Sequence, residues 1–299
     1  MKTEDGYQKI ETTVSPIVET KMDANNPVGT GSFSMGRKAG SIVGTDSHAE
    51  GYNTIASRES SHAEGQNTTA SGYGSHAEGG STTAQGDYSH AEGNTTSASG
   101  NYSHAEGQNT TASGSYSHAE GQKTTASGYG SHAEGTNTFA IGNYSHTEGS
   151  GTIASSIGSH AEGLTTSASG NYSHTEGAGT IASGSCSHTE GLYTRAKSSN
   201  QHVQGKYNVE DSQDKYAHIV GNGTSESARS NAYTLDWNGN AWFNGRPQFG
   251  GTEMGIGSQT VMANGDKEII LASSTEGSTK KFKITVDDSG ALTATEVTT

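Results

Sequence analysis

Histidine, glutamate and serine recur together at a fixed spacing, and these residue types can catalyse reactions or bind metals. Twelve of the thirteen histidines lie fourteen residues apart, from His48 to His202. In the first eleven copies the phrase reads Ser-His-Ala-Glu-Gly or Ser-His-Thr-Glu-Gly. A fixed period of this kind is the signature of a repeat architecture, so any chemistry must be judged within one repeated unit.

A hydrolase triad is the first chemistry that this phrase suggests, and strand geometry argues against it. Successive side chains of a strand point to opposite faces, so Ser47 and His48 diverge, whereas a catalytic triad needs converging groups. Eleven equivalent copies do not describe one active site either. We therefore predict that the protein is not an enzyme and needs no cofactor.

Metal binding is the second chemistry to consider. Histidines that meet around a symmetry axis would offer imidazole ligands suited to zinc, nickel or iron. A glutamate two residues after each histidine is a simpler partner, so we favour a hydrogen-bonded row and predict no metal site; a metal-binding solenoid is the alternative. We call this row the His–Glu ladder; it consists of His48, Glu50, His62, Glu64, His76, Glu78, His90, Glu92, His104, Glu106, His118, Glu120, His132, Glu134, His146, Glu148, His160, Glu162, His174, Glu176, His188 and Glu190.

Each fourteen-residue copy divides into two halves of seven that share one template: Ser or Thr, any residue, Ala, any residue, Gly, then two turn residues. Five alternating residues and a two-residue corner predict a short strand and a tight turn. Two strands per copy make one coil of a flattened parallel β-solenoid. We expect Ser, Ala and Gly of the first half and Thr, Ala and Gly of the second half to face inward.

The two outer faces of such a solenoid differ in variability. The His and Glu never change among the eleven copies, whereas the second half carries residues as different as Phe139, Ile153 and Arg195. Because small inward residues bury little apolar area, one outer face must be covered. We expect the constrained His–Glu ladder to pack against identical chains. An outward row of Thr and Ser in the second half leaves an ice-binding solenoid as a further alternative.

The same argument predicts a pH dependence. Glutamates stacked about 5 Å apart would repel one another unless histidines lie between them. We expect the neighbouring carboxylates to raise the histidine pKa values in the assembled protein. Their stabilising contribution would then be complete below a pH of about 6.5 and would be lost as the pH rises through the folded pKa.

Composition excludes several classes of partner. Only 28% of the 299 residues are hydrophobic, and the formal net charge is −14, which disfavours nucleic acid and anionic membranes. The single cysteine, Cys186, allows no disulfide framework. The chain has neither a run of membrane-spanning length nor an apolar run in residues 1–15 for a signal peptide. We therefore expect no membrane insertion.

The repeats from Phe33 to Gly205 resemble the head of the trimeric autotransporter adhesins, a left-handed parallel β-roll built from Ser-x-Ala-x-Gly repeats. This resemblance implies an all-β homotrimer. In that family the two residues written x in the Ser-x-Ala-x-Gly half-repeat face the threefold interior. Here they are His and Glu instead of the family's aliphatic residues, so the interface would be polar and hydrogen-bonded. The family's signal peptide and its membrane-anchoring barrel are not found in the sequence.

The two ends of the chain differ from the repeats, and we divide the chain into residues 1–32, 33–205 and 206–299. The first segment has apolar residues at a helical spacing, namely Tyr7, Ile10, Val14 and Ile17, but Pro16 disturbs this pattern. Residues 1–32 are therefore either a docking segment or a flexible leader. In the third, Asn238-Gly239-Asn240 indicates a hairpin, and 267–272, 281–286 and 291–297 read as strands of a small β domain.

Residues 231–245 and the Ser-His-Ala-Glu-Gly repeats are also similar to tail-fibre proteins of phages and prophages. This resemblance implies that the chain is a structural fibre on a virion and is made in the host cytoplasm. Its N-terminal segment would bind capsid or tail proteins, and its C-terminal end would lie near a host glycan or protein. A bacterial cell-surface adhesin is the alternative. Four aromatic residues could contact such a receptor or form the hairpin's own core: Tyr233, Trp237, Trp242 and Phe243.

Overall fold

The computed structural model describes residues 31–38, 41–245, 269–272, 281–286 and 289–297. The predicted docking segment at residues 1–30 lies outside the described residues. The chain divides into two units, 1–246 and 247–299. The described residues contain strands and turns and no helix, so none of them forms a helix that could cross a membrane.

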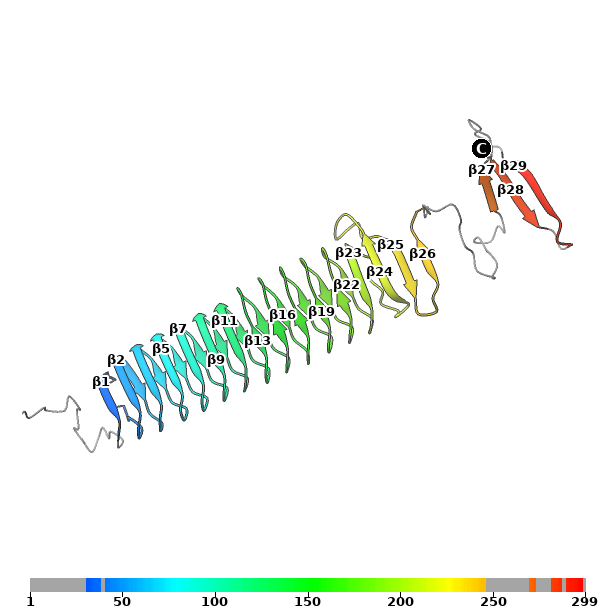
Figure 1. Cartoon of the computed structure of the whole chain (residues 1–299). Helices are drawn as coiled ribbons and strands as arrows, with labels where there is room; N and C mark the ends of the chain where they lie inside the picture. The colour runs from blue at the N-terminus through cyan, green and yellow to red at the C-terminus, as the bar shows by residue number, and fades with distance from the viewer. Residues whose placement is uncertain (1–30, 39–40, 246–268, 273–280, 287–288, 298–299) are drawn as a thin grey trace, which may run out of the picture. The chain divides into compact units, whose positions relative to one another are not determined.

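The first unit is a parallel β-solenoid whose coils stack in sequence order (Figure 1). Each regular coil contributes one strand to each of two sheets. The strands of the first sheet are β1 (Phe33–Arg37), β2 (His48–Ala56), β3 (His62–Gln66), β5 (His76–Gly80), β7 (His90–Asn94), β9 (His104–Gln108), β11 (His118–Gln122), β13 (His132–Ala133), β15 (His146–Thr147), β17 (His160–Ala161), β19 (His174–Thr175), β21 (His188–Thr189), β23 (His202–Lys206) and β24 (Tyr216–Asn222).

The second sheet is narrower, with two residues per strand. It contains the end of β2, then β4 (Thr69–Ala70), β6 (Thr83–Ala84), β8 (Ser97–Ala98), β10 (Thr111–Ala112), β12 (Thr125–Ala126), β14 (Phe139–Ala140), β16 (Ile153–Ala154), β18 (Ser167–Ala168), β20 (Ile181–Ala182) and β22 (Arg195–Ala196). In both sheets equivalent residues pair, as His62 does with His76 and Thr69 with Thr83. The fourteen-residue repeat therefore fixes the register.

The corners explain why the chain repeats every seven residues. From Asp46 to Asp214 every seventh residue has a left-handed backbone, with φ between 43° and 68°. Glycine and asparagine occupy many of these positions, as expected, but Tyr102 and Lys123 are also there. These side chains are held in an unfavourable conformation because the coils above and below make the same turn.

The interior is a column of alanines between rows of serine and threonine. Ala63, Ala70 and their equivalents are fully buried, and so are Ser61 and Thr68. Each buried methyl adds only about 0.8 kcal/mol to stability, so a single coil has a small core. The prediction of an inward Ser, Ala and Thr is confirmed.

The prediction that the first-half glycine also faces inward is wrong. Gly65 is exposed, because the backbone there adopts φ = 103° and the strand's alternation ends. An added Cβ would lie 2.2 Å from the carbonyl oxygen of Gly79 in the next coil. This position requires glycine for the close approach of two coils.

The solenoid ends in an antiparallel extension. Strand β24 still pairs in parallel with β23, and β25 (Asn231–Asp236) and β26 (Ala241–Phe243) then continue the first sheet as an antiparallel hairpin. The hairpin predicted around Gly239 is confirmed. The boundary predicted between 205 and 206 falls inside this unit, because the sheet runs through it without a break.

The second unit contains one antiparallel sheet of three strands, β27 (Ile269–Ala272), β28 (Lys281–Val286) and β29 (Leu292–Val297). These match the three strands that the sequence predicts after residue 266.

Candidate functional site: the His–Glu ladder

All members of the His–Glu ladder lie on the outer face of the first sheet. Their histidine rings stack along the solenoid, with centroids 4.5–5.0 Å apart and planes within 12° of parallel from His62 to His218. Phe33 packs on His48 at one end, and Tyr233 followed by Phe243 continues the row at the other. The result is one continuous row of ring contacts, parallel-stacked from His62 to His218 and tilted or edge-on at its two ends.

The thirteenth histidine, His218, was missed by the sequence analysis because it lies sixteen residues after His202. Its strand nevertheless pairs in register, with His202 opposite His218 and Gly205 opposite Gly221. The phrase His-Ile-Val-Gly at 218–221 matches His-Val-Gln-Gly at 202–205. This pattern was a usable signal despite the altered spacing.

The contacts between His and Glu are longer than the sequence analysis assumes. The Nε2 atom of His48 lies 3.1 Å from Oε2 of Glu50, within hydrogen-bonding range. From His62 to His132 the corresponding distances are 3.4–3.8 Å. These are electrostatic contacts rather than good hydrogen bonds, so the predicted hydrogen-bonded row is formed only at its first coil.

The pairing changes partner along the solenoid. Up to His132 each histidine contacts the glutamate of its own coil, whereas His174, His188 and His202 contact the glutamate of the preceding coil at 3.6–3.8 Å. The change coincides with the shortening of the first-sheet strands from five residues to two at β13. Backbone pairing continues beyond β13, as from Thr136 N–H to the carbonyl oxygen of Gly149. A groove of about 770 Å³ runs along this part of the sheet, lined by Glu134, Glu148, Glu162, Glu176, Glu190 and Gln204 and by intervening glycines.

In the single chain the electrostatics of the histidines differ from the expectation for the assembled protein. Burial, followed by the charge of neighbouring imidazoles, lowers the pKa of His62, His90, His118, His132, His160, His188, His202 and His218. For His160 the pKa falls to about 4. The glutamates act in the opposite direction, but burial and the stacked imidazoles outweigh them. In the single chain the pKa of these eight histidines is thus lowered, and the rise expected for the assembled protein stays a prediction.

Hydrogen bonds between neighbouring glutamates of the groove shift their pKa values in opposite directions. Hydrogen bonding to Glu148, together with burial, raises the pKa of Glu162 to about 7. Hydrogen bonds from Glu162 and Glu134 lower the pKa of Glu148. Hydrogen bonding thus favours the protonated form of Glu162 and the ionised form of Glu148, which reduces repulsion between them.

The four aromatic residues of the predicted receptor contact do not form one cluster. Tyr233 and Phe243 continue the ladder, with ring centroids 5.1 Å apart. Trp242 packs edge-on against Tyr216, and the ammonium of Lys215 lies 4.9 Å from its ring centroid. Tyr233, Trp242 and Phe243 line a recess of about 250 Å³, whereas Trp237 lies outside it on the hairpin turn.

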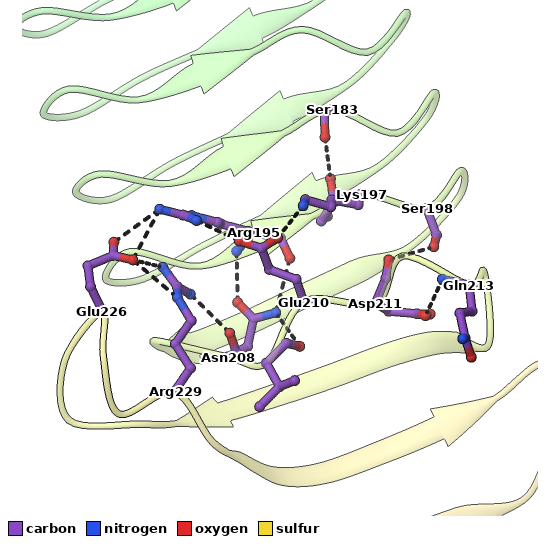
Figure 2. A network of polar contacts seen from close by, with 12 residues as sticks. Ser183, Arg195, Lys197, Ser198, Asn208, Glu210, Asp211, Gln213, Glu226 and Arg229 are labelled. Carbon is purple, nitrogen blue, oxygen red and sulfur yellow. Dashed lines mark hydrogen bonds and ion pairs between the residues drawn. The ribbon is translucent and has the colours of Figure 1, made fainter.

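A second feature that the sequence analysis missed is a polar network where the solenoid meets its antiparallel extension (Figure 2). The guanidinium of Arg195 donates to Glu210 at 2.5 Å and to Glu226 at 3.1 Å. Lys197 also pairs with Glu210, and Arg229 donates to Glu226 at 2.7 Å. Arg195 occupies the outward position that varies from coil to coil, so the repeat pattern does not indicate a role for it. Its role is seen only from its partners, which lie beyond residue 206.

The family model described as the YadA head domain repeat matches residues 63–89, 91–117 and 119–145. The coils between residues 63 and 145 are YadA head domain repeats. Each matched segment covers nearly two fourteen-residue coils, which agrees with the family's description as two copies. A search of curated proteins found no match.

The YadA head domain repeats account for the coils between residues 63 and 145 and suggest an adhesin-type structural fibre. The resemblance stated from the sequence is confirmed for these coils. Proteins with this head are non-enzymatic in general, and Ser47 and His48 lie on opposite sides of the sheet, Ser47 buried and His48 half-buried. The coils thus present a repetitive surface rather than one active centre.

Proposed function

We propose that three copies of this chain form a rigid fibre in which the His–Glu ladders pack around a common axis. The observation that carries the proposal is the contrast between the interior and the ladder. The interior is a column of alanines with little apolar area, while one outer face carries an unbroken row of aromatic ring contacts from Phe33 to Phe243. YadA head domains form trimers in general, which supports the same assembly.

The fibre would serve in attachment, with the solenoid as a shaft. The resemblance of residues 231–245 to phage tail fibres supports a place on a phage or phage-like particle, bound through the N-terminal segment and exposed on the virion surface. The YadA head domain repeats support a bacterial surface adhesin equally well. In both settings the recess beside Trp242 is the candidate contact for a host glycan or protein.

Sedimentation of the full-length protein tests the assembly. We expect a particle of three 30.7-kDa chains. Glu106→Trp places a bulky ring on the ladder and should break the trimer. Thr111→Trp places the same ring on the opposite face of the same coil, in a column that already carries Phe139 and Ile153, and should leave the trimer intact. A well-folded wild-type monomer would refute the proposed fibre.

Immunogold electron microscopy separates the two settings. Antibodies against residues 206–299 should label phage particles released by the producing cells if the chain is a virion fibre. Labelling confined to the bacterial surface would support the adhesin instead.

A further inference from the structure

We propose that the His–Glu ladder binds divalent first-row transition-metal ions at sites made of two imidazoles and one carboxylate. Four such sets occur, centred on Glu92, Glu106, Glu120 and Glu162. Each set consists of the glutamate, the histidine two residues before it and the histidine twelve residues after it. In every set the three donor atoms lie within 4.8 Å of one another. The sets exist within a single chain, so the proposal does not depend on the trimer.

The donor atoms lack adequate partners. The Nε2 atoms of His90, His104, His160 and His174 are shielded from solvent and make no hydrogen bond. The nearest carboxylate oxygens lie 3.6 Å from Nε2 of His90, His104 and His174, too far for a good hydrogen bond. Buried polar atoms normally have a partner. A cation about 2.0–2.1 Å from each nitrogen would provide one.

The donor types indicate the class of ion. Two imidazole nitrogens and one carboxylate oxygen suit zinc, nickel, cobalt, copper or iron, whereas calcium and magnesium prefer oxygen ligands alone. A neutral imidazole offers a free lone pair on one nitrogen, which is the form that binds metal. The glutamate beside each histidine favours a His–Glu hydrogen bond over a metal. At 3.6 Å, however, the contacts of His90, His104 and His174 are too long for a good hydrogen bond.

Ring geometry limits how the ions bind. His160 and His174 are stacked 4.7 Å apart and within 7° of parallel, so their lone pairs do not converge on one point. Both rings must rotate toward the ion, and each side chain is part-exposed, which leaves room for this rotation. The set centred on Glu106 shares one histidine with the Glu92 set and one with the Glu120 set. At most three ions can therefore occupy the four sets of one chain.

Cobalt titration of the metal-free, full-length protein at pH 7.5 tests the proposal. We expect saturable binding of up to three Co²⁺ per chain, with visible absorption bands from nitrogen coordination. A variant with Glu92→Gln, Glu106→Gln, Glu120→Gln and Glu162→Gln should bind Co²⁺ at least tenfold more weakly. The matched control carries Glu50→Gln, Glu59→Gln, Glu64→Gln and Glu190→Gln, four glutamates that belong to no set, and should bind like the wild type.

Glutamine keeps the shape of glutamate, and circular dichroism checks that both variants fold. Absence of saturable Co²⁺ binding by the wild type would overturn the proposal, as would equal affinity of the two quadruple variants. Sedimentation of the same samples separates this result from the assembly. A monomer whose Co²⁺ binding depends on the four glutamates would support the metal sites while refuting the trimer.

Discussion

The imidazole rings of His202 and His218 stack 5.0 Å apart and 9° from parallel, although sixteen residues separate them instead of fourteen. The carboxylate of Asp211 organises the longer loop between them by accepting hydrogen bonds from the backbone N–H groups of Gln213, Lys215 and Tyr216. The two extra residues are thus absorbed outside the strands. The histidine rings stack because their strands pair in register. A constant spacing of fourteen residues produces that register in the other coils, but it is not required.

Acidification should destabilise the solenoid. The lowered histidine pKa values mean that the unfolded chain binds more protons than the folded one below a pH of about 6.5. The stability from the eight shifted histidines is present above that value and is lost as the pH falls toward 4, the region of the His160 pKa. Thermal melting followed by circular dichroism from pH 8 to pH 4 should show a falling melting temperature.

Glu162 opposes this trend. Its raised pKa gives a contribution that is complete below about 4.5 and is lost as the pH climbs through about 7. The pKa values of Glu78 and Glu134 are raised as well. These three carboxyl groups are outweighed by eight imidazoles, so the net slope should follow the histidines. His160→Gln should flatten the profile, and a melting temperature higher at pH 5 than at pH 8 would contradict the prediction.

Gly107→Ala should destabilise the stack strongly. Gly107 has φ = 103°, and a Cβ there would lie 2.2 Å from the carbonyl oxygen of Gly121. The backbone strain alone costs about 1–3 kcal/mol, before any clash is counted. Gly80→Ala is the matched control, because its Cβ would meet only the side-chain amide of Asn94, at 3.1 Å. Hydrogen exchange should show faster opening around β9 and β11 in the first variant; similar protection in both would refute the argument.

The repeat made much of this fold predictable. A template repeated every seven residues specifies a turn at each end of every strand, and the alternation within it places Ala63 and Ala70 inside. The template does not show where alternation stops, so the exposure of Gly65 was missed. That error has a physical cause, because glycine serves equally for tight packing and for positive φ.

Interactions between coils were harder to predict. Glu64 is visible beside His62 in the sequence, and this suggested raised pKa values. Burial, followed by the charges of His76 and His48 on either side, lowers the pKa of His62, and both effects depend on register in three dimensions. Arg195 likewise has the appearance of a drifting surface residue, because its partners Glu210 and Glu226 lie fifteen and thirty-one residues later in the sequence.

Ala105→Leu should destabilise the solenoid by about 1–3 kcal/mol, the usual cost of overpacking. Ala105 is fully buried, with Ala91 and Ala119 paired on either side of it. Thr111→Leu adds the same side chain to the outer face of that coil and should change stability by no more than about 0.5 kcal/mol. Urea unfolding of the two variants provides the comparison. A larger loss for Thr111→Leu would show that the assignment of inner and outer faces is wrong.

Arg195→Thr should loosen the antiparallel extension from the solenoid. Burial tends to raise the pKa of Glu210, but hydrogen bonds and charges from Lys197 and Arg195 hold it below its usual value. Removal of Arg195 leaves Glu210 with Lys197 alone and Glu226 with Arg229 alone, so residues 208–231 should become more open to proteolysis. Because most of this network is part-exposed, a loss of about 1–2 kcal/mol in the free energy of unfolding is expected.

Arg58→Ala is the matched control, since its guanidinium packs 4.6 Å from the ring centroid of Tyr73, far from the extension. Equal cleavage rates between 208 and 231 in the two variants would show that Arg195 does not hold the extension in place.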